Sequence, residues 1–434
     1  MTPGLVALIL FGTFLGLVLL RVPVAFALAL ACTPVFVLEP RLTPVLLLQE
    51  MFRSYNSFVL LAVPFFLLAA NLMNAAGITD RLIRLARALV GHLPGGLGHV
   101  NIVVSMFFAG ISGSSTADAA GIGSLLIPQM RKAGFAASFA VAITACSAVM
   151  GVIIPPSILM IVWGGLMSVS IGGMFLAGIV PGILIGLSQM VTTYIYARRY
   201  GYPIHARSSL GELAGALAGA ALALLTPLII VGGIVGGVFT PTEASVVAVL
   251  YSLILGTLVY RTVGPAKLGH VLYDTGRFAA ISLFCIGTAS AFGWLLAYFK
   301  IPTLLIAGIE DLGLGPVGFG LLVAGAFLVI GCFIDAIPAI IILGTVLLPV
   351  AQHVGMHPIH FALIGVISLA FGLVTPPYGL CLLIACAIGE IRVAAALRDV
   401  AIILAPMLLV LLIVILFPNL VLFLPRLIMP RFID

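Results

Sequence analysis

Long apolar runs recur from one end of the chain to the other, and each is about as long as a helix that crosses a lipid bilayer. Hydrophobic residues occupy 63% of the 434 positions and charged residues only 7%, against about 25% in a soluble domain. Such a chain cannot cover itself with polar groups, so lipid must be most of its solvent. The runs lack the alternation of barrel strands, and the sequence therefore predicts an all-α polytopic membrane protein.

The apolar runs divide into ten candidate spans and two stretches of a different kind. The two stretches, 97–130 and 316–349, are each long enough for two short helices, and small or polar residues interrupt each near its middle. Non-helical backbone at membrane depth has to be buried in protein, so this pattern predicts re-entrant helical hairpins. The candidate spans are 4–20, 23–38, 57–76, 136–170, 173–196, 212–236, 241–260, 277–299, 359–390 and 400–424.

The two halves of the chain repeat each other. A shift of 221 residues without gaps aligns seven glycine or proline pairs within residues 110–159, where chance gives about one. Glycine and proline mark special backbone positions, so the two copies are predicted to share backbone geometry. The pairs are Gly110 with Gly331, Gly123 with Gly344, Pro128 with Pro349, Gly134 with Gly355, Gly151 with Gly372, Pro155 with Pro376, and Pro156 with Pro377.

Charged residues argue against nucleic-acid binding and suggest how the two copies are oriented. The net charge is +6, but the 19 Lys and Arg form no basic face. Residues 78–92 predict an amphipathic helix with Thr79 as its N-cap. Its arginines precede the first hairpin, and Arg131 and Lys132 follow that hairpin, so both ends of the hairpin are predicted to be cytoplasmic. Residues 350–358 after the second hairpin hold no Lys or Arg, which predicts periplasmic ends. Inverted repeats of this kind are typical of secondary transporters.

Oxygen-bearing side chains interrupt both hairpins. The first carries Gly110-Ile-Ser-Gly-Ser-Ser-Thr-Ala-Asp118, a break that suits a hard cation such as Na⁺ or, at a helix N-terminus, an anion. Close packing by small residues is the alternative. In the second hairpin Asp335 is a functional candidate because a carboxylate is costly in an apolar run, and it is equally a candidate N-cap.

Paired prolines break the two spans that follow the hairpins. Gly151-Val-Ile-Ile-Pro-Pro-Ser157 and Gly372-Leu-Val-Thr-Pro-Pro-Tyr378 each lose two backbone donors and free carbonyl oxygens for a cation. The alternative is a plain kink.

Three further groups of residues have simpler interpretations. The run from Thr240 to Glu243 predicts a helix capping box. His353, His357 and His360 are predicted to lie in a solvated loop, since Pro358 breaks any helix that joins them. The six cysteines form no CxxC pair and are predicted to be packing residues, and no nucleotide-binding or nucleophile motif is present.

Taken together, these stretches resemble the large (DctM-type) subunit of tripartite ATP-independent periplasmic (TRAP) transporters, a family of the ion-transporter superfamily. The resemblance covers nearly the whole chain. The stretches that carry it are FAGISGSSTADAAGIGSLLIP (108–128), IIPPS (153–157), FLAGIVPG (175–182), FTPTEAS (239–245), ASAFGWLLA (289–297), LLPVA (347–351) and GLVTPPYG (372–379).

The resemblance implies a multi-pass protein of the bacterial inner membrane that uses sodium, with no further cofactor, to import an organic acid by an elevator movement. It also implies a separate small four-helix membrane subunit and a periplasmic substrate-binding protein as partners. The implied parts are scaffold helices and an amphipathic arm at 1–96, a transport half at 97–196 with its broken helix at 136–170, scaffold helices and a second arm at 197–315, a second transport half at 316–399 with its broken helix at 359–390, and a C-terminal helix at 400–434.

Two sodium sites and one substrate site follow from the resemblance. The first sodium is expected at Ser112, Ser114, Ser115, Gly151 and Pro155, and the second at Cys332, Asp335, Gly372, Thr375 and Pro376. The organic acid is expected between the two tips, at Ser115, Thr116, Asp118, Pro156, Ser157, Pro377 and Tyr378.

Two other functions remain open at this point. A stand-alone sodium/carboxylate symporter of the same superfamily would need no binding protein. An intramembrane aspartyl hydrolase would use Asp118 and Asp335 as paired carboxylates, although the repeat aligns these residues with Ala339 and Ser114 rather than with each other.

Overall fold

A computed structural model describes residues 1–204, 206–311 and 313–430, and within these ranges all regular structure is helical. The prediction of an all-α polytopic protein is confirmed. The parts of the predicted segments 197–315 and 400–434 that fall on residues 205, 312 and 431–434 lie outside the described residues. Within the described part, six helices are long and apolar enough to cross a membrane, and a seventh span is possible if one bent pair counts as one.

The first half of the chain runs from α1 to α10. Its helices are α1 (Pro3–Leu19), α2 (Val24–Leu38), α3 (Val45–Tyr55), the short η1 (Val59–Leu61), α4 (Ala62–Ala75), α5 (Ile78–Val90), α6 (Gly96–Ser112), α7 (Ser115–Lys132), α8 (Ala137–Ala148), the short η2 (Val149–Val152), α9 (Ile158–Met167) and α10 (Ile171–Tyr200).

The second half runs from α11 to α20. Its helices are α11 (Leu210–Val235), α12 (Pro241–Ile254) with a π-helical end η3 (Leu255–Val259), α13 (Pro265–Tyr298), α14 (Ile301–Asp311), α15 (Pro316–Gly331), α16 (Ala336–His353), α17 (Pro358–Gly372), α18 (Leu380–Gly389), α19 (Val393–Leu416) and α20 (Pro418–Ile428).

The helix boundaries follow the repeat found in the sequence. Helix α16 begins and ends 221 residues after α7, and α17 begins 221 residues after α8. Each predicted hairpin stretch folds as two helices that pack on each other, α6 with α7 and α15 with α16. Both predicted broken spans are interrupted at their proline pairs.

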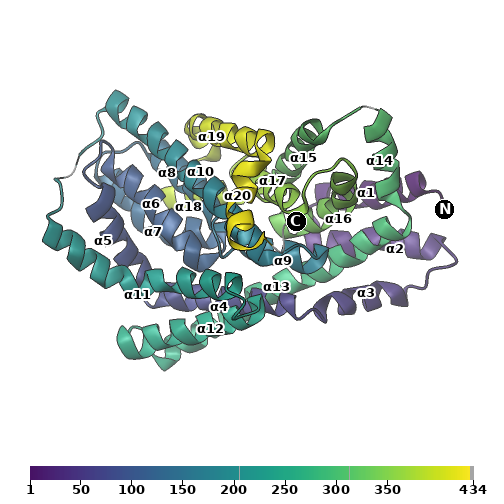
Figure 1. Cartoon of the computed structure of the whole chain (residues 1–434), viewed down its shortest axis with the longest axis horizontal. Coiled ribbons are helices and arrows are strands. Elements are labelled where there is room, and N and C mark those ends of the chain that lie inside the picture. Colours follow the sequence, from purple (N-terminus) through teal and green to yellow (C-terminus); the bar gives the residue numbers. More distant parts are fainter. Residues whose placement is uncertain (205, 312, 431–434) are drawn as a thin grey trace.

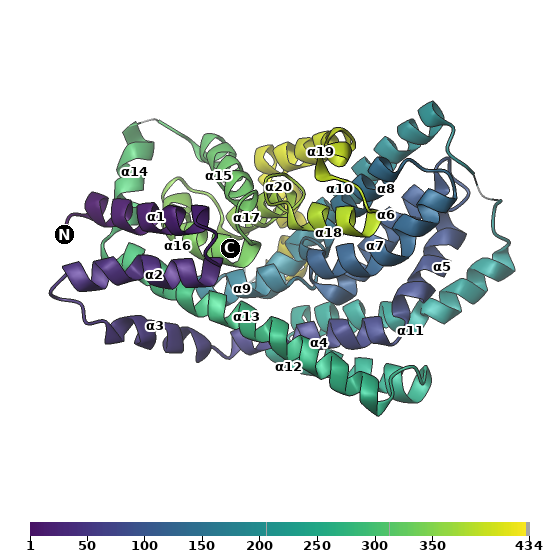
Figure 2. The ribbon, with the colours of Figure 1, turned by 180° about the vertical axis from the view of Figure 1, so that it is seen from behind.

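The two copies exchange helices. Helix α7 packs against α18, and α16 packs against α9. The helix that follows each proline break therefore packs against the hairpin of the other copy. In Figure 1, α6, α7, α8 and α18 lie in the left half of the molecule, while α15, α16, α17 and α9 lie in the right half. Figure 2 shows the same division from behind. This reciprocal packing joins the two hairpins into one unit.

Helices α3, α4, α11, α12 and α13 form a layer along one edge of this unit, seen at the bottom of Figure 1. Helix α4 packs on α12 and α13, and α3 packs on α13. A bend of 69° separates α3 from the segment Val59–Ala75. The layer meets the hairpins where α13 contacts α16 and where α4 contacts α6.

Several predicted boundaries were wrong. Helix α13 begins at Pro265 and not at 277, because the polar residues of its first turns hide a helix that Pro265 starts at N1. Thr79 is not the N-cap of α5: Gly77 precedes that helix with a φ of +74°, a conformation that favours glycine. Thr79 is buried, and its hydroxyl donates to Asn74 Oδ1 at 3.2 Å. Helices α3, α14 and α20 were not predicted as separate elements.

The histidine cluster was only partly predicted. His357 caps α17 by accepting a bond from the Ile359 N–H. His360 does not lie in a solvated loop: it is buried, and its Nε2 donates to the Val414 carbonyl oxygen at 2.8 Å. No group of three metal-ligating residues is found within the described ranges.

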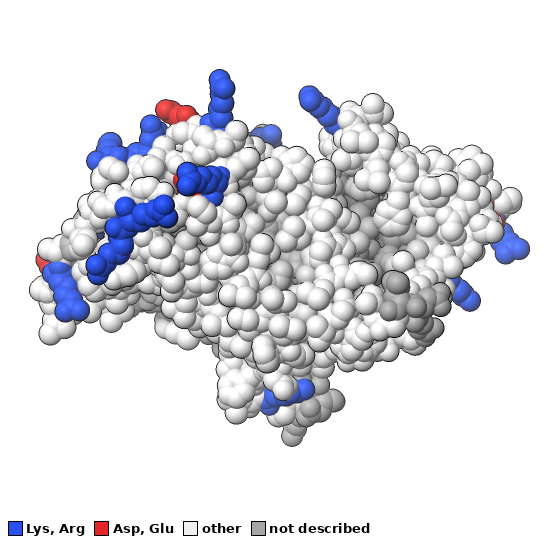
Figure 3. Space-filling model, turned by 90° about the horizontal axis from the view of Figure 1, so that it is seen from above, with Lys and Arg blue, Asp and Glu red and all other residues white. Residues whose placement is uncertain are grey.

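Basic side chains gather at one end of the molecule, on the left in Figure 3. Hydrogen bonds connect the helix ends that meet there. Arg87 of α5 donates to Gln129 of α7 at 2.9 Å, and Arg131 donates to the Gly389 carbonyl oxygen at 3.0 Å. These basic ends belong to the elements that the sequence assigned to the cytoplasmic side, and positive residues are typical of that side.

The predicted capping box is confirmed at the start of α12. The Thr240 hydroxyl accepts from the Glu243 N–H at 3.3 Å, and the Glu243 carboxylate accepts from the Thr240 N–H at 2.8 Å. Thr240→Ala is expected to lower the free energy of unfolding by about 1 kcal/mol, since the cap satisfies otherwise free donors. Thermal unfolding in detergent measures the loss, and Thr240→Ser, which keeps the hydroxyl, should behave as wild type. Equal unfolding temperatures for both variants would contradict this role.

Candidate functional site

The tip of the first hairpin is a two-residue break between α6 and α7. Gly113 takes a φ of +63°, which ends α6. Ser114 then caps α7: its Oγ accepts from the Ala117 N–H at 3.5 Å, while its own N–H donates to Ser112 Oγ at 3.3 Å. The Thr116 hydroxyl lies 3.1 Å from Ser114 Oγ. Three hydroxyl oxygens therefore converge on one short turn.

Asp118 lies beneath this turn, in the first turn of α7. Its side chain is 0% exposed. One carboxylate oxygen accepts a short hydrogen bond from the Ser112 hydroxyl. The other, Oδ2, is buried and has no hydrogen-bond partner among the described residues. A buried carboxylate oxygen without a partner is costly, so this position calls for a positive charge or a donor.

The broken span of the first copy supplies the opposite wall. A Cβ added to Gly151 would lie 2.9 Å from the Asp118 carboxyl carbon and 3.1 Å from the Ser114 carbonyl carbon. The chain then leaves helical geometry through the cis Pro155–Pro156 bond. Ser157 caps α9 by accepting from the Met160 N–H at 3.3 Å. The non-helical backbone of this span thus lies directly against the hairpin tip.

One backbone hydrogen bond joins each tip to its own broken span. In the first copy the Ile158 N–H donates to the Gly113 carbonyl oxygen at 3.2 Å. In the second copy the Tyr378 N–H donates to the Cys332 carbonyl oxygen at 2.8 Å. Both tips are therefore bonded to their own broken spans, but the bonded residues do not align under the 221-residue shift, so the two bonds are not repeat-equivalent.

The tip of the second hairpin, residues 332–335, differs in its side chains. Asp335 caps α16 by accepting from the Ala336 N–H at 2.8 Å, which confirms its predicted role as an N-cap. Thr375 Oγ1 donates to the Phe371 carbonyl oxygen near the end of α17 at 2.8 Å, and Cys332 Sγ donates to the Leu328 carbonyl oxygen at 3.1 Å. The Thr375 hydroxyl and the Cys332 thiol thus both donate to carbonyl oxygens four residues earlier in the chain.

The two tips also differ in exposure. Ser112, Ser115, Asp118, Pro156 and Ser157 of the first copy are all buried. In the second copy Phe333 is 56% and Tyr378 39% exposed, and Asp335 and Pro377 are also classed as exposed. The second tip therefore borders open space, and the first does not.

The structure brings together most, but not all, of the residues that the sequence assigned to the first sodium site. Ser112, Ser114 and Gly151 meet around Asp118, which the sequence had assigned to the substrate. Ser115 lies beside Cys381 at the start of α18, and Pro155 lines a groove toward α10 and α11. At the second tip Gly331 and Gly372 cross closely: a Cβ on Gly331 would lie 3.2 Å from the Gly372 Cα. The sequence analysis missed Gly113, whose position between two serines is the signal for a turn.

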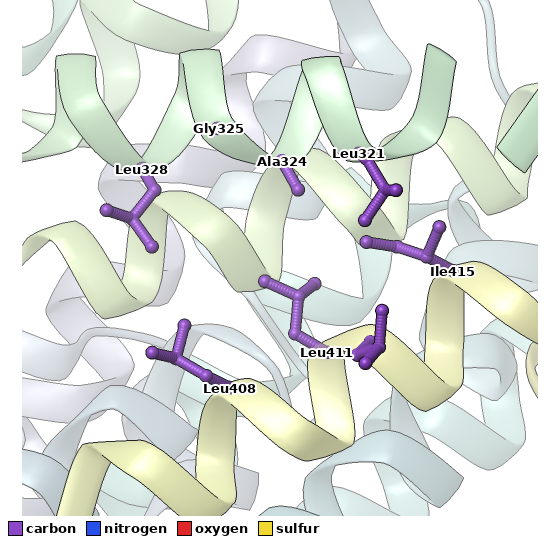
Figure 4. A pocket seen from close by; sticks show the side chains of 8 residues that line it. Leu321, Ala324, Gly325, Leu328, Leu408, Leu411 and Ile415 are labelled. Atoms are coloured by element: carbon purple, nitrogen blue, oxygen red, sulfur yellow. The ribbon is translucent and has the colours of Figure 1, made fainter. Parts of the chain in front are cut away.

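Two apolar grooves elsewhere lack the groups that a polar substrate needs. One, of about 260 Å³, lies between α15 and α19, where Leu321 and Leu328 face Leu408 and Ile415 (Figure 4). The other, of about 380 Å³, lies between the first broken span, α10 and α11. Both are lined by apolar side chains, which suits lipid contact rather than recognition of an acid.

Comparison with known proteins agrees with this architecture. The family described as "Tripartite ATP-independent periplasmic transporter, DctM component" matches residues 11–420. The chain belongs to the DctM family. It is 38% identical over 418 residues to the sialic acid TRAP transporter large permease protein SiaM of Vibrio cholerae, covering 96% of this chain and 98% of that protein. It is 34% identical to the 2,3-diketo-L-gulonate TRAP transporter large permease protein YiaN of Escherichia coli, covering 91% and 92%.

A solved structure shares the fold. The YdaH transporter of Alcanivorax borkumensis superposes with a TM-score of 0.62 over 88% of this DctM chain and 90% of that chain, at 16% sequence identity. Membership of the DctM family makes the chain a multi-pass inner-membrane transport protein and not an enzyme. The aspartyl hydrolase hypothesis is therefore dismissed.

Proposed function

We propose that this DctM chain is the large membrane subunit of a sodium-coupled TRAP transporter that imports an organic acid by an elevator movement. The observation that carries the proposal is the buried second oxygen of Asp118, which has no partner among the described residues. A sodium ion beside Asp118, within reach of Ser112, Ser114 and the Gly151 backbone, would neutralise this charge with oxygen ligands. Sodium in this position supplies the coupling.

The remaining site assignments extend this proposal. Ser115 and Pro155, which the resemblance also assigned to the first sodium site, lie beside Cys381 and on the groove toward α10 and α11, so the proposed site at Asp118 does not depend on them. The second sodium lies at Asp335 and Thr375, with the backbone of Gly372 and Pro376 and the side chain of Cys332. The exposure of Asp335 supports it, because a carboxylate bonded only to its neighbour's N–H retains capacity for a cation.

The substrate lies between the tips and enters from the second. Tyr378 and Pro377 are exposed there, while Thr116 is half-buried at the first tip. The named substrates of two relatives, sialic acid and 2,3-diketo-L-gulonate, are both acids, which supports an organic acid for this chain. Asp118 and Ser157 form the inner side of the substrate site, since both are fully buried.

The elevator movement rests on the division of the fold. The halves 97–196 and 316–399 form one transport unit through the α7–α18 and α9–α16 contacts. The segments 1–96 and 197–315 form the scaffold layer against which that unit slides, and 400–434 closes the chain. Opposite orientation of the two hairpins, each re-entering from its own side, gives the unit access to both faces of the membrane.

Partners complete the system. A periplasmic binding protein delivers the acid, and a small four-helix subunit packs on the scaffold. One relative is the isethionate TRAP transporter permease protein DctMQ of Oleidesulfovibrio alaskensis, and the match covers only 64% of its length. Its name contains a second letter, Q, beside the M of the DctM component.

Reconstitution tests the proposal. Proteoliposomes that contain this chain and its small subunit, supplied with the binding protein and its acid, are expected to accumulate the acid when a sodium gradient is imposed. A potassium gradient of equal size should give no accumulation. Absence of sodium-driven uptake with all three components present would overturn the proposal. Uptake by this chain alone would instead identify the stand-alone symporter.

A further inference from the structure

A buried side-chain network joins the first hairpin to the helix that follows it. Asn101 of α6 is 0% exposed, and both polar atoms of its amide have hydrogen-bond partners. Its Nδ2 donates to Thr144 Oγ1 of α8 at 2.6 Å and to Met130 Sδ of α7 at 3.8 Å. Its Oδ1 accepts from Ser147 Oγ at 2.9 Å, and Ser105 Oγ donates to Ser147 Oγ at 2.9 Å.

The network connects the two helices that carry the opposite walls of the first tip. Ser105 lies seven residues, or about two helical turns, before Ser112 on α6. Ser147 lies four residues before Gly151 on the stretch formed by α8 and η2. Any sliding of the α6–α7 hairpin along α8 would separate Ser112 and Asp118 from Gly151. The network therefore fixes the spacing of the groups around the unpartnered carboxylate oxygen.

The second copy provides an internal comparison. Its residues at the equivalent positions are Leu322, Ala326, Gly365 and Ser368, and the first three have no hydrogen-bonding side chain. Ser368 Oγ donates at 2.7 Å to the Ile364 carbonyl oxygen of its own helix. Yet α15 and α17 pack closely against each other. Packing of this helix pair thus does not require the polar groups, so the first copy has them for another reason.

We propose that Asn101, Thr144 and Ser147 are positioning residues that hold the first sodium site ready in the absence of substrate. This inference rests on the sodium site proposed at Asp118. Among the described residues, the equivalent positions of the second copy form no such network.

Sodium-dependent thermal stability of the full chain in detergent, without substrate, tests the positioning role. Sodium chloride is compared with choline chloride at equal ionic strength. Wild type is expected to be stabilised by sodium alone. Thr144→Val, which keeps the shape and loses the hydroxyl, is expected to need about 3- to 15-fold more sodium, the range of one or two interhelical hydrogen bonds. Thr144→Ser, which keeps the hydroxyl, restores the wild-type sodium dependence.

The repeat offers a matched control pair. Ser147→Ala is expected to weaken sodium stabilisation, while Ser368→Ala at the equivalent position of the second copy leaves it unchanged. If sodium stabilises wild type but not Asp118→Asn, and Thr144→Val and Ser147→Ala keep wild-type sodium dependence, the positioning role is overturned and the sodium site stands. If sodium has no specific effect on wild type, both are overturned.

Discussion

Asp118→Asn is expected to weaken the sodium dependence of uptake strongly. The substitution keeps the shape of the side chain and its bond to Ser112 but removes the negative charge at the buried Oδ2 position. Loss of one partner of a buried charge pair costs about 3–5 kcal/mol, which corresponds to about 100-fold or greater loss of sodium affinity. The sodium concentration that gives half-maximal uptake in proteoliposomes measures the effect.

A charge removed elsewhere provides the control for this variant. Asp80 lies exposed in the first turn of α5 and belongs to neither hairpin, so Asp80→Asn is expected to leave sodium dependence as in wild type. Both variants should insert and purify alike, because neither changes side-chain size. Wild-type sodium dependence in Asp118→Asn would mean that this carboxylate does not hold the coupling ion.

Much of the fold could be predicted from the chain because backbone chemistry is visible in sequence. Paired prolines at 155–156 and 376–377 cannot continue a helix, and the structure breaks both spans there. The spacing of Thr240 and Glu243 predicted a cap that forms as expected. Glycine and proline also revealed the repeat, because they record backbone geometry even where side chains differ.

The remainder depends on contacts that no local pattern encodes. The start of α13 was missed because hydropathy reports lipid contact and not helix, and its first turns are polar. The pairing of Ser112 with Asp118 follows from how the hairpin tip closes, so the sequence assigned Asp118 to the substrate. Asn101 was read as part of an apolar run. A lone amide there is itself a signal, because it must find partners in lipid.

The side-chain difference between the tips was equally hidden. Aligned glycines predicted like geometry, and each tip does bond to its broken span through the backbone, although the bonded residues are not repeat-equivalent. Yet the residues near those glycines differ: Gly151 meets the Asp118 carboxylate, while Gly372 meets the Gly331 backbone. One backbone design thus holds a charged site in one copy and a close helix crossing in the other, and the chemistry of the two tips cannot be inferred from their symmetry.

Gly151→Ala is therefore expected to eliminate transport by disturbing the charged site itself. The new methyl group would lie 2.9 Å from the Asp118 carboxyl carbon and 3.1 Å from the Ser114 carbonyl carbon, closer than van der Waals contact allows. The carboxylate or the hairpin tip must move, which costs about 1–3 kcal/mol of stability and displaces the proposed sodium ligands. Sodium-driven uptake and sodium-dependent thermal unfolding together measure the effect.

Alanine at a glycine with open surroundings is the control that distinguishes this clash from a general effect of alanine in a helix. Gly325 of α15 lies on the wall of the apolar groove in Figure 4, and an added Cβ there would meet no atom within 4 Å. Gly325→Ala is expected to transport as wild type and to be no less stable, since alanine favours a helix. Because the two variants add the same methyl group, a difference between them isolates the space beside Asp118. Full transport by Gly151→Ala would show that this space is not needed, and a sodium ion could not then be held there by the Gly151 backbone.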